Sequence, residues 1–198
     1  MQPAIAPRFA PARLREARRQ LLEQLGYRFS VLDASVDEVR APGEPPEDYV
    51  RRVAREKAGA GLVQVAATPH AVVLAADTEV VLGDDVFGKP ADADAARAML
   101  ARLAGRAHRV LSAVCIADAG REKLVLQEST VHVAALDAAA IDAYVATGEP
   151  FGKAGAYGIQ GRAAAFVSRI DGSYTGVMGL PLFETARLLR EFGVAAAR

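Results

Sequence analysis

The longest unbroken hydrophobic stretch near the middle of the chain, residues 71–76, contains six apolar residues in a row and ends at Asp77 and Thr78. A short apolar run without alternation is typical of a strand that is covered on both faces. In open α/β sheets the ligand crevice usually lies at the end of such a strand, which makes Asp77 a candidate catalytic residue. This stretch alone is equally compatible with the alternative that Asp77 begins a turn and caps a loop.

Helices and strands alternate on both sides of this run, which predicts an α/β domain. Apolar residues at helical spacing predict helices over residues 13–25, 46–60, 92–103, 138–147 and 181–192. Strand patterns are expected over residues 27–32, 71–78, 108–116, 123–136 and 164–170, with a hairpin over 80–87. Because a hairpin interrupts the alternation, we predict a mixed central sheet flanked by helices.

The two ends of the chain are exceptions to this pattern. Residues 1–13 contain Pro3, Pro7 and Pro11 and show no clear period. Proline removes a hydrogen-bond donor from a strand ladder, so a central strand is unfavourable there and we recognise none. The tail over residues 193–198 is expected to fray. We therefore predict one domain over residues 1–198, with an atypical N-terminus.

Two basic residues, Lys57 and Arg18, lie on apolar helix faces, where a positive charge needs a partner. Lys57 is centred on the apolar face of the helix over 46–60, and we expect it to reach a cleft or an acidic group. Arg18 lies on the apolar stripe of the first helix, where it either extends to water or meets a carboxylate. Lys89 precedes Pro90 in an extended or turn conformation, which by itself is unremarkable.

Composition narrows the classes of function. Hydrophobic residues make up 52% of the 198 residues and the formal net charge is zero, so binding to nucleic acid by bulk electrostatics is not expected. No apolar stretch is long enough to cross a membrane, and no signal-peptide core is recognisable, so a cytoplasmic location is expected. The single cysteine, Cys115, is expected to be a buried apolar residue, and the histidines lack metal-ligand spacing.

Six segments in this order and spacing resemble the Maf family of nucleoside triphosphate pyrophosphatases, in particular its dTTP/UTP branch. They are LLEQLG over 21–26, VAREKA over 53–58, AADT over 75–78, GKP over 88–90, KAGAYGIQG over 153–161, and GSY over 172–174 with VMGLPL over 177–182. Each segment alone is a weak signal. Together they cover the chain from about Leu21 to Phe192.

The resemblance implies a fold and an activity. The fold would be a mixed sheet with two lobes around a deep cleft, similar to inosine triphosphatase. The activity would be hydrolysis of dTTP and UTP, or of modified pyrimidine nucleotides, to the monophosphate and pyrophosphate. A divalent cation, Mg²⁺ or Mn²⁺, would be required, and a homodimer is a further implication.

The resemblance also implies a role for individual residues. Asp77 would be the proton acceptor that activates water, and Glu38 and Asp77 would lie at the metal. The remaining implied roles are substrate selection by Thr78, Gln160 and Arg18, and phosphate binding by Lys57 and Lys89. A cation in a cleft suits a polyanionic substrate, and the Gln160 amide can both donate and accept at a pyrimidine edge.

The chain departs from the family pattern at its N-terminus, where the family carries Ser-x-Ser-Pro-Arg-Arg. Ungapped alignment puts Arg15 at the second serine, Glu16 at the proline, Ala17 at the first arginine and Arg18 at the second. An alternative function is therefore a nucleotide-binding protein whose catalysis is impaired by the altered motif. A pyrophosphatase with purine preference is disfavoured by the stretch over 157–160.

Overall fold

A computed structural model describes residues 5–8, 12–33 and 36–196 and contains a mixed six-stranded sheet. The strand order is β1-β2-β4-β5-β6, with β3 paired to β2. β1 runs parallel to β2, and the other pairs are antiparallel. The strands are β1 (Ile5–Arg8), β2 (Val72–Leu82), β3 (Asp85–Phe87), β4 (Ala107–Ala117), β5 (Glu122–Val133) and β6 (Val167–Asp171).

Within the described residues, six α-helices and two short 3₁₀ helices accompany the sheet, which confirms the expected mixed α/β fold. The α-helices are α1 (Ala12–Gln24), α2 (Pro46–Gln64), α3 (Ala93–Leu103), α4 (Ala138–Val145), α5 (Tyr174–Val177) and α6 (Leu182–Glu191). The 3₁₀ helices are η1 (Ala154–Ala156) and η2 (Arg162–Phe166). Asp92 and Asp137 cap α3 and α4 by accepting hydrogen bonds from backbone amides three residues later.

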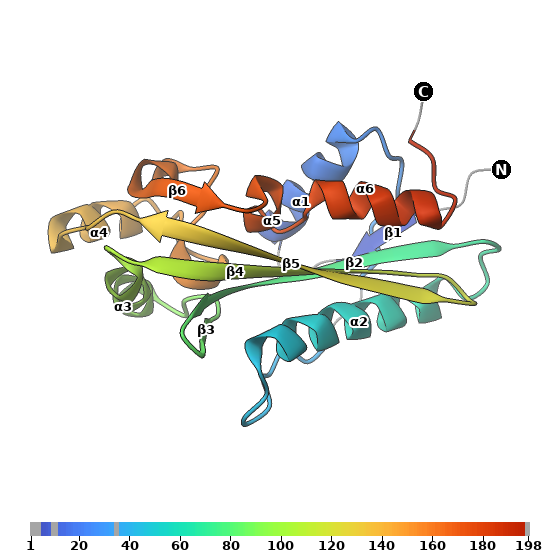
Figure 1. Cartoon of the computed structure of the whole chain (residues 1–198), viewed down its shortest axis with the longest axis horizontal. Helices are drawn as coiled ribbons and strands as arrows, with labels where there is room; N and C mark the ends of the chain where they lie inside the picture. Colours follow the sequence, from blue (N-terminus) through green and yellow to red (C-terminus); the bar gives the residue numbers. More distant parts are fainter. Residues whose placement is uncertain (1–4, 9–11, 34–35, 197–198) are drawn as a thin grey trace.

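β2 is the central strand for function, and helices cover both of its faces (Figure 1). Because side chains alternate across a strand, Leu74 and Ala76 face the layer that contains α1 and α6, whereas Ala75 faces α2. Figure 1 shows α2 below the sheet and α1, α5 and α6 above it. The prediction of a strand buried on both faces is confirmed, since residues 72–76 are at most 3% exposed.

Close contact between α2 and β2 depends on a glycine. A Cβ atom placed on Gly61 would lie 2.8 Å from Cγ1 of Val73, nearer than real Cβ contacts allow. Gly61 therefore lets the helix approach the strand closely. This approach fixes the distance over which Lys57, one turn earlier in α2, reaches toward the odd-numbered residues of β2.

Two strand predictions were wrong. Ile5–Arg8 forms β1, a four-residue strand parallel to β2, in a part where the sequence indicated none. Its place at the edge of the sheet explains why Pro7 is tolerated, since an edge strand need not donate on both sides. Residues 27–32 form no ladder beyond an isolated bridge at Phe29. The side chains of 5–8 and 12–15, including that of Arg15, lie outside the described part.

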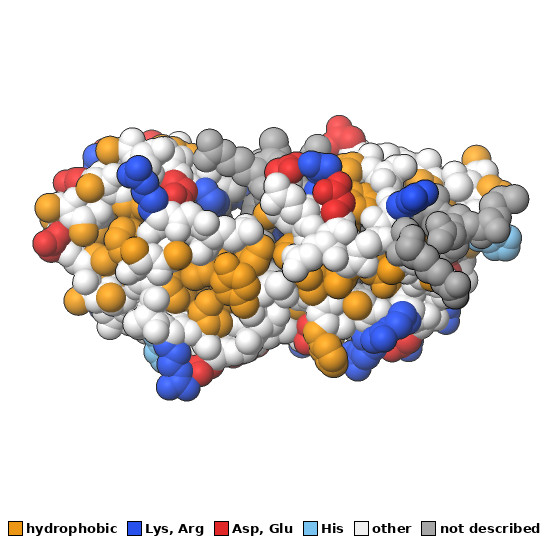
Figure 2. Space-filling model, turned by 90° about the horizontal axis from the view of Figure 1, so that it is seen from above, with side chains coloured by type: hydrophobic (Ala, Val, Ile, Leu, Met, Phe, Trp, Pro, Cys, Tyr) orange, Lys and Arg blue, Asp and Glu red, His pale blue; other side chains and the backbone are white. Residues whose placement is uncertain are grey.

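The surface on the side of α1, α5 and α6 is mixed in character. Figure 2 shows hydrophobic side chains gathered along the middle of this face and charged side chains toward its rims. Among the described residues, no helix has the length and apolar character needed to span a membrane.

Candidate active site

Two cavities meet beside β2. The first, of about 210 Å³, is lined by charged side chains and is called the charged cavity; its lining residues are Arg18, Glu38, Tyr49, Lys57, Asp77, Thr78, Glu79, Gly88, Lys89 and Ala154. The second, of about 320 Å³, is called the apolar cavity and includes Ala17, Thr78, Val80, Val110, Lys153, Ala154, Tyr157, Ile159, Gln160, Val177 and Met178. Thr78 and Ala154 line both cavities, so the two adjoin at these residues.

A buried lysine organises the charged cavity. Lys57 is 3% exposed, and its Nζ lies 2.7 Å from Oδ1 of Asp77 and 2.7 Å from Oε1 of Glu38. The other oxygen of Glu38, Oε2, lies 3.1 Å from Nζ of Lys89. The expected acidic partner of Lys57 is thus present twice, and one row of alternating charges runs from Asp77 through Lys57 and Glu38 to Lys89.

Two carboxylate oxygens of residues that line this cavity could still accept a ligand. Oδ2 of Asp77 and Oε2 of Glu79 are shielded from solvent and have no hydrogen-bond partner within the described residues. Asp77 and Glu79 are two positions apart on β2, so their side chains emerge from the same face. Buried polar atoms are rarely left without partners, and such atoms at a cavity wall indicate a missing ligand.

The charges of the cavity shift the protonation of its acids in opposite directions. Burial opposes ionisation of Glu38, but hydrogen bonds from Lys57 and Lys89 outweigh it and lower the pKa of that carboxyl. For Glu79, burial raises the pKa well above its usual range, and the negative charge of Asp77 adds to the effect. Glu38 is therefore held as a carboxylate by its lysines, whereas no ion pair to Glu79 is found within the part of the chain that the structure describes.

Arg18 ties three segments together at the border of the two cavities. Its Nε donates to the carbonyl of Gly179 at 2.7 Å, Nη1 to the carbonyl of Ala76 at 3.0 Å, and Nη2 to Oγ1 of Thr78 at 3.1 Å. Burial lowers the pKa of Arg18 to about 10, so the guanidinium remains charged at neutral pH. The inward-facing arginine of α1 has its partners in backbone carbonyls and a hydroxyl.

Thr78 is held from several sides. Besides Arg18, its Oγ1 lies 2.9 Å from Oγ of Ser112, which in turn donates to the carbonyl of Gly176 at 2.7 Å. These bonds join β2 and β4 to the segment before α6. The side chain at the junction of the two cavities is consequently fixed in position.

The glycine-rich stretch over 151–162 builds the wall of the apolar cavity. Gly155 has φ of +69°, and a Cβ there would lie 2.9 Å from the side chain of Val80, so both backbone conformation and space favour glycine. The amide of Gly155 donates to the carbonyl of Gly88 at 3.2 Å, which joins this stretch to the turn that carries Lys89. The stretch is therefore shaped by its neighbours rather than being a free surface loop.

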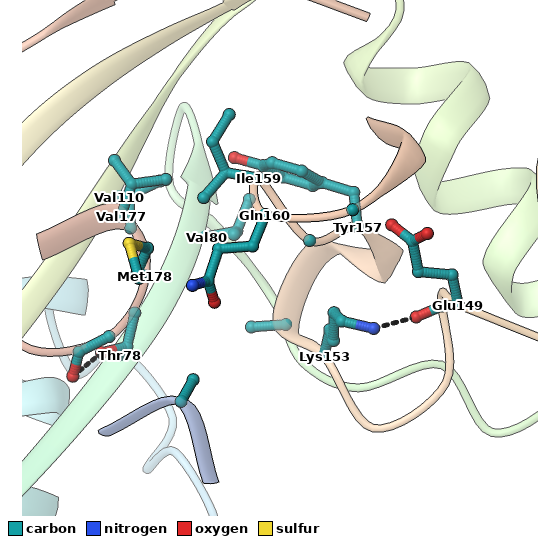
Figure 3. A pocket seen from close by; sticks show the side chains of 15 residues that line it. Thr78, Val80, Val110, Glu149, Lys153, Tyr157, Ile159, Gln160, Val177 and Met178 are labelled. Atoms are coloured by element: carbon teal, nitrogen blue, oxygen red, sulfur yellow. Dashed lines mark hydrogen bonds between the residues drawn. The ribbon is translucent and has the colours of Figure 1, made fainter. Parts of the chain in front are cut away.

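Gln160 extends from this stretch into the apolar cavity. Figure 3 shows its amide pointing into the space between Met178 and Lys153, with Thr78 on the far side. The ammonium of Lys153 donates to the backbone carbonyl of Glu149 at the opposite rim. A flat heterocycle in this cavity would meet apolar walls and one exposed amide.

Tyr157 is anchored beneath this wall by a buried histidine. Its hydroxyl lies 2.7 Å from Nε2 of His108, and the two rings meet edge to face. Burial lowers the pKa of His108 to about 4, so the imidazole is neutral at physiological pH. His108 is thus a structural residue of the wall.

The structure places the seven residues predicted for the site in the walls of the two cavities. Those that line the charged cavity are Arg18, Glu38, Lys57, Asp77, Thr78 and Lys89, and Gln160 lines the apolar cavity. Sequence reasoning missed Glu79 and Tyr49. The position of Glu79, two residues after Asp77 on a strand, was a signal that could have identified it.

The donor set of the charged cavity fits a divalent cation held jointly with a ligand. Among the described residues, no three His, Cys, Asp or Glu side chains converge in a way that could hold a metal ion. Mg²⁺ needs no such arrangement, because it is usually held by one or two carboxylates, substrate phosphates and water. The open oxygens of Asp77 and Glu79 match that mode.

Comparison with known proteins gives consistent matches. A family model described as Maf-like protein matches residues 16–192. A dTTP/UTP pyrophosphatase from Xanthomonas campestris pv. campestris is 58% identical over 178 residues, covering 89% of this chain and 94% of that protein. Proteins of the same name from Cupriavidus metallidurans and Aromatoleum aromaticum are 54% and 52% identical, each over 89% of this chain and over 92% and 91% of the respective relative.

Proposed function

The chain belongs to the Maf-like protein family, and from this membership we propose that it is a nucleoside triphosphate pyrophosphatase that hydrolyses dTTP and UTP to the monophosphate and pyrophosphate. The observation that carries the proposal is the pairing of a charged cavity with an apolar one across Thr78. A nucleotide has the same division, with a polyanionic chain at one end and a flat base at the other.

The phosphate chain is proposed to occupy the charged cavity. Lys57 and Lys89 supply two ammonium groups, and the Arg18 guanidinium adds a third positive charge at the border. Lys57 is fixed between two carboxylates, and Lys89 is partly exposed beside Glu38. Fixed positive groups in a shielded site stabilise a polyanion without having to reorganise when it binds.

The base is proposed to enter the apolar cavity and to meet Gln160. An amide that both donates and accepts can pair with the edge of uracil or thymine. Thr78, held by Arg18 and Ser112, would lie where the base end and the phosphate end of the substrate join. We propose that Thr78 and Arg18 act in substrate selection by fixing this junction.

Asp77 is proposed to accept the proton of the attacking water at Oδ2. Lys57 holds the other oxygen of this carboxylate, so Asp77 is oriented while Oδ2 stays open. The water oxygen bonds to the α-phosphorus as the bond from that phosphorus to the bridging oxygen breaks. The electron pair of the broken bond leaves with pyrophosphate, and Asp77 carries the proton away.

A divalent cation, Mg²⁺ or Mn²⁺, is part of the proposal. The charged cavity has three basic and three acidic side chains, so its basic groups are largely matched by acidic ones and cannot by themselves neutralise a triphosphate. When bound, the cation would neutralise phosphate charge and order the phosphate oxygens. The family resemblance points to Glu38 and Asp77 as its holders.

A panel of nucleoside triphosphates tests the proposal. The protein is incubated with Mg²⁺ and each triphosphate, and pyrophosphate release is measured alongside the melting temperature. We expect dTTP and UTP to be turned over faster than ATP, GTP and CTP. If dTTP and UTP raise the melting temperature without releasing pyrophosphate, the nucleotide-binding function with impaired catalysis replaces this proposal.

A further inference from the structure

We infer that Glu79 is the second carboxylate, with Asp77, that holds the divalent cation in this chain, and that Glu38 instead positions the two lysines. The inference rests on the proposed function, because the cation is taken to bind together with the phosphates of the substrate. It adds to the site a residue that the family resemblance did not point to.

The argument begins with the oxygen atoms of Glu38. Oε1 lies 2.7 Å from Nζ of Lys57, and Oε2 lies 3.1 Å from Nζ of Lys89, so each oxygen is engaged by an ammonium group. The backbone carbonyl of the same residue accepts a hydrogen bond from Oη of Tyr49 at 2.7 Å. To take up a cation, Glu38 would have to share oxygens that are already engaged by the two lysines.

The two oxygens of Asp77 also have separate roles. Oδ1 lies 2.7 Å from Nζ of Lys57, and Oδ2 is the atom that must accept a proton from water. Asp77 is 6% exposed and lines the cavity, so its carboxylate can contribute to holding a cation there. A single carboxylate with one open oxygen is a poor holder by itself, because Mg²⁺ and Mn²⁺ favour several oxygen ligands.

Glu79 supplies the missing oxygen. It lines the same cavity, and its Oε2 is shielded and unpartnered within the described residues. Its Cα is about 7 Å from that of Asp77, because the two residues are two positions apart on one strand and share a face. Two carboxylates at this spacing repel each other in a shielded site, and a divalent cation between them removes the repulsion.

Glu38 retains a different task under this assignment. By contacting both ammonium groups it sets the distance between Lys57, on α2, and Lys89, on the turn after β3. We therefore class Glu38 as a positioning residue. Its loss should change how the phosphates bind more than how the cation binds.

Mn²⁺ binding to the full chain tests the assignment directly. Binding of MnCl₂ is followed by electron paramagnetic resonance, with and without the non-hydrolysable analogue α,β-imido-dTTP, for the wild type, Glu79→Gln and Glu38→Gln. Both variants exchange a carboxylate for an amide of nearly equal size in the same cavity, so each serves as the control for the other. We expect Glu79→Gln to weaken Mn²⁺ binding by about 10-fold or more, and Glu38→Gln by less than about 3-fold.

Two further measurements make each outcome decisive. Thermal melting checks that the variants fold; if Glu79→Gln does not, Glu79→Asp, which keeps the charge and withdraws it by one methylene group, should still weaken Mn²⁺ binding. Binding of the analogue should weaken more in Glu38→Gln than Mn²⁺ binding does. The inference is overturned if Glu79→Gln, or Glu79→Asp in its place, binds Mn²⁺ as the wild type does, or if Glu38→Gln loses Mn²⁺ more severely.

Failure of the inference can be told apart from failure of the proposed function. A wild type that releases pyrophosphate from dTTP while Glu79→Gln keeps its Mn²⁺ affinity retains the function and refutes the role of Glu79. A wild type that binds Mn²⁺ through Glu79 but releases no pyrophosphate from dTTP or UTP refutes the function and leaves the metal assignment standing.

Discussion

The charged cavity and the apolar cavity take alternate residues from the same strand. Asp77 and Glu79 of β2 line the charged cavity, Val80 lines the apolar one, and Thr78 lines both. The charged cavity is held together by side chains, since one buried ammonium group contacts two carboxylates. One wall of the apolar cavity is shaped by backbone, through the glycine-rich stretch and its bond to Gly88.

This difference predicts how each cavity responds to substitution. In a network of buried charges, removal of one member leaves its partners uncompensated, so the effect spreads. In a wall shaped by backbone, removal of one side chain acts mainly where that side chain points. We therefore expect large effects on turnover and stability from the charged cavity, and smaller effects on selectivity from the apolar one.

The largest effect is expected from Asp77→Asn. The amide cannot accept the water proton, so kcat for dTTP should fall by about 10²- to 10⁴-fold, the usual range for loss of a general base. Pyrophosphate release at saturating dTTP measures the loss, and thermal melting confirms that the variant is folded. Turnover at the wild-type rate would show that Asp77 is not the general base. The charged cavity would then lose its largest expected effect.

The features that could be predicted from the sequence are those that have a local signal. Lys57 was identifiable because a lysine on an apolar helix face needs an acidic partner, and α2 indeed carries it to Asp77. β2 was identifiable from its unbroken apolar run. Both are local signals that survive without knowledge of long-range contacts.

The parts that the sequence did not reveal depend on position in the sheet. Pro7 argued against a strand, but it lies on the edge strand β1, where the usual cost of proline does not apply. Residues 27–32 have a strand-like composition, yet they form no ladder, because strand pairing is decided by tertiary context as well as by propensity. Glu79 is different, because its position two residues after Asp77 on a predicted strand already places both side chains on one face.

Substitution of each lysine in turn compares the stability contributed by the buried and the partly exposed ion pairs of the charged cavity. Lys57→Met leaves Asp77 buried without its cation and should lower the free energy of unfolding by about 3–5 kcal/mol. Lys89→Met breaks a partly exposed pair with Glu38 and should cost about 0–1 kcal/mol. Urea denaturation of both variants measures the difference. Equal losses would mean that Lys57 does not organise the network.

The pH dependence of stability probes the wall of the apolar cavity. Burial lowers the pKa of His108 to about 4 in the folded state, so between that pH and the ordinary value near 6.5 the unfolded chain binds more protons. Stability from this residue is present above pH 6.5 and is lost as the pH falls toward 4. We expect a loss of about 2 kcal/mol between pH 7.5 and pH 5.

Two histidine variants isolate this contribution. His108→Gln should flatten the decline in urea-denaturation stability between pH 7.5 and pH 5. His132→Gln removes a histidine that is exposed beside Asp171, and it should keep most of the decline. If the stability of His108→Gln declines with pH as steeply as that of the wild type, His108 does not contribute to the pH dependence of stability.

The smallest effect is expected from Gln160→Ala, and it should appear in selectivity. Gln160 is exposed at the cavity rim, and its amide points into the space proposed for the base (Figure 3). A neutral hydrogen bond is worth about 0.5–1.5 kcal/mol, so the preference for UTP over ATP, expressed as a ratio of kcat/KM, should fall by about 3- to 10-fold. Gln24→Ala, at the end of α1, is the matched surface control. If selectivity falls while the melting temperature and kcat for dTTP stay near the wild-type values, recognition of the base is separable from the charged network. If kcat instead falls as far as it does in Asp77→Asn, the two cavities act as one unit.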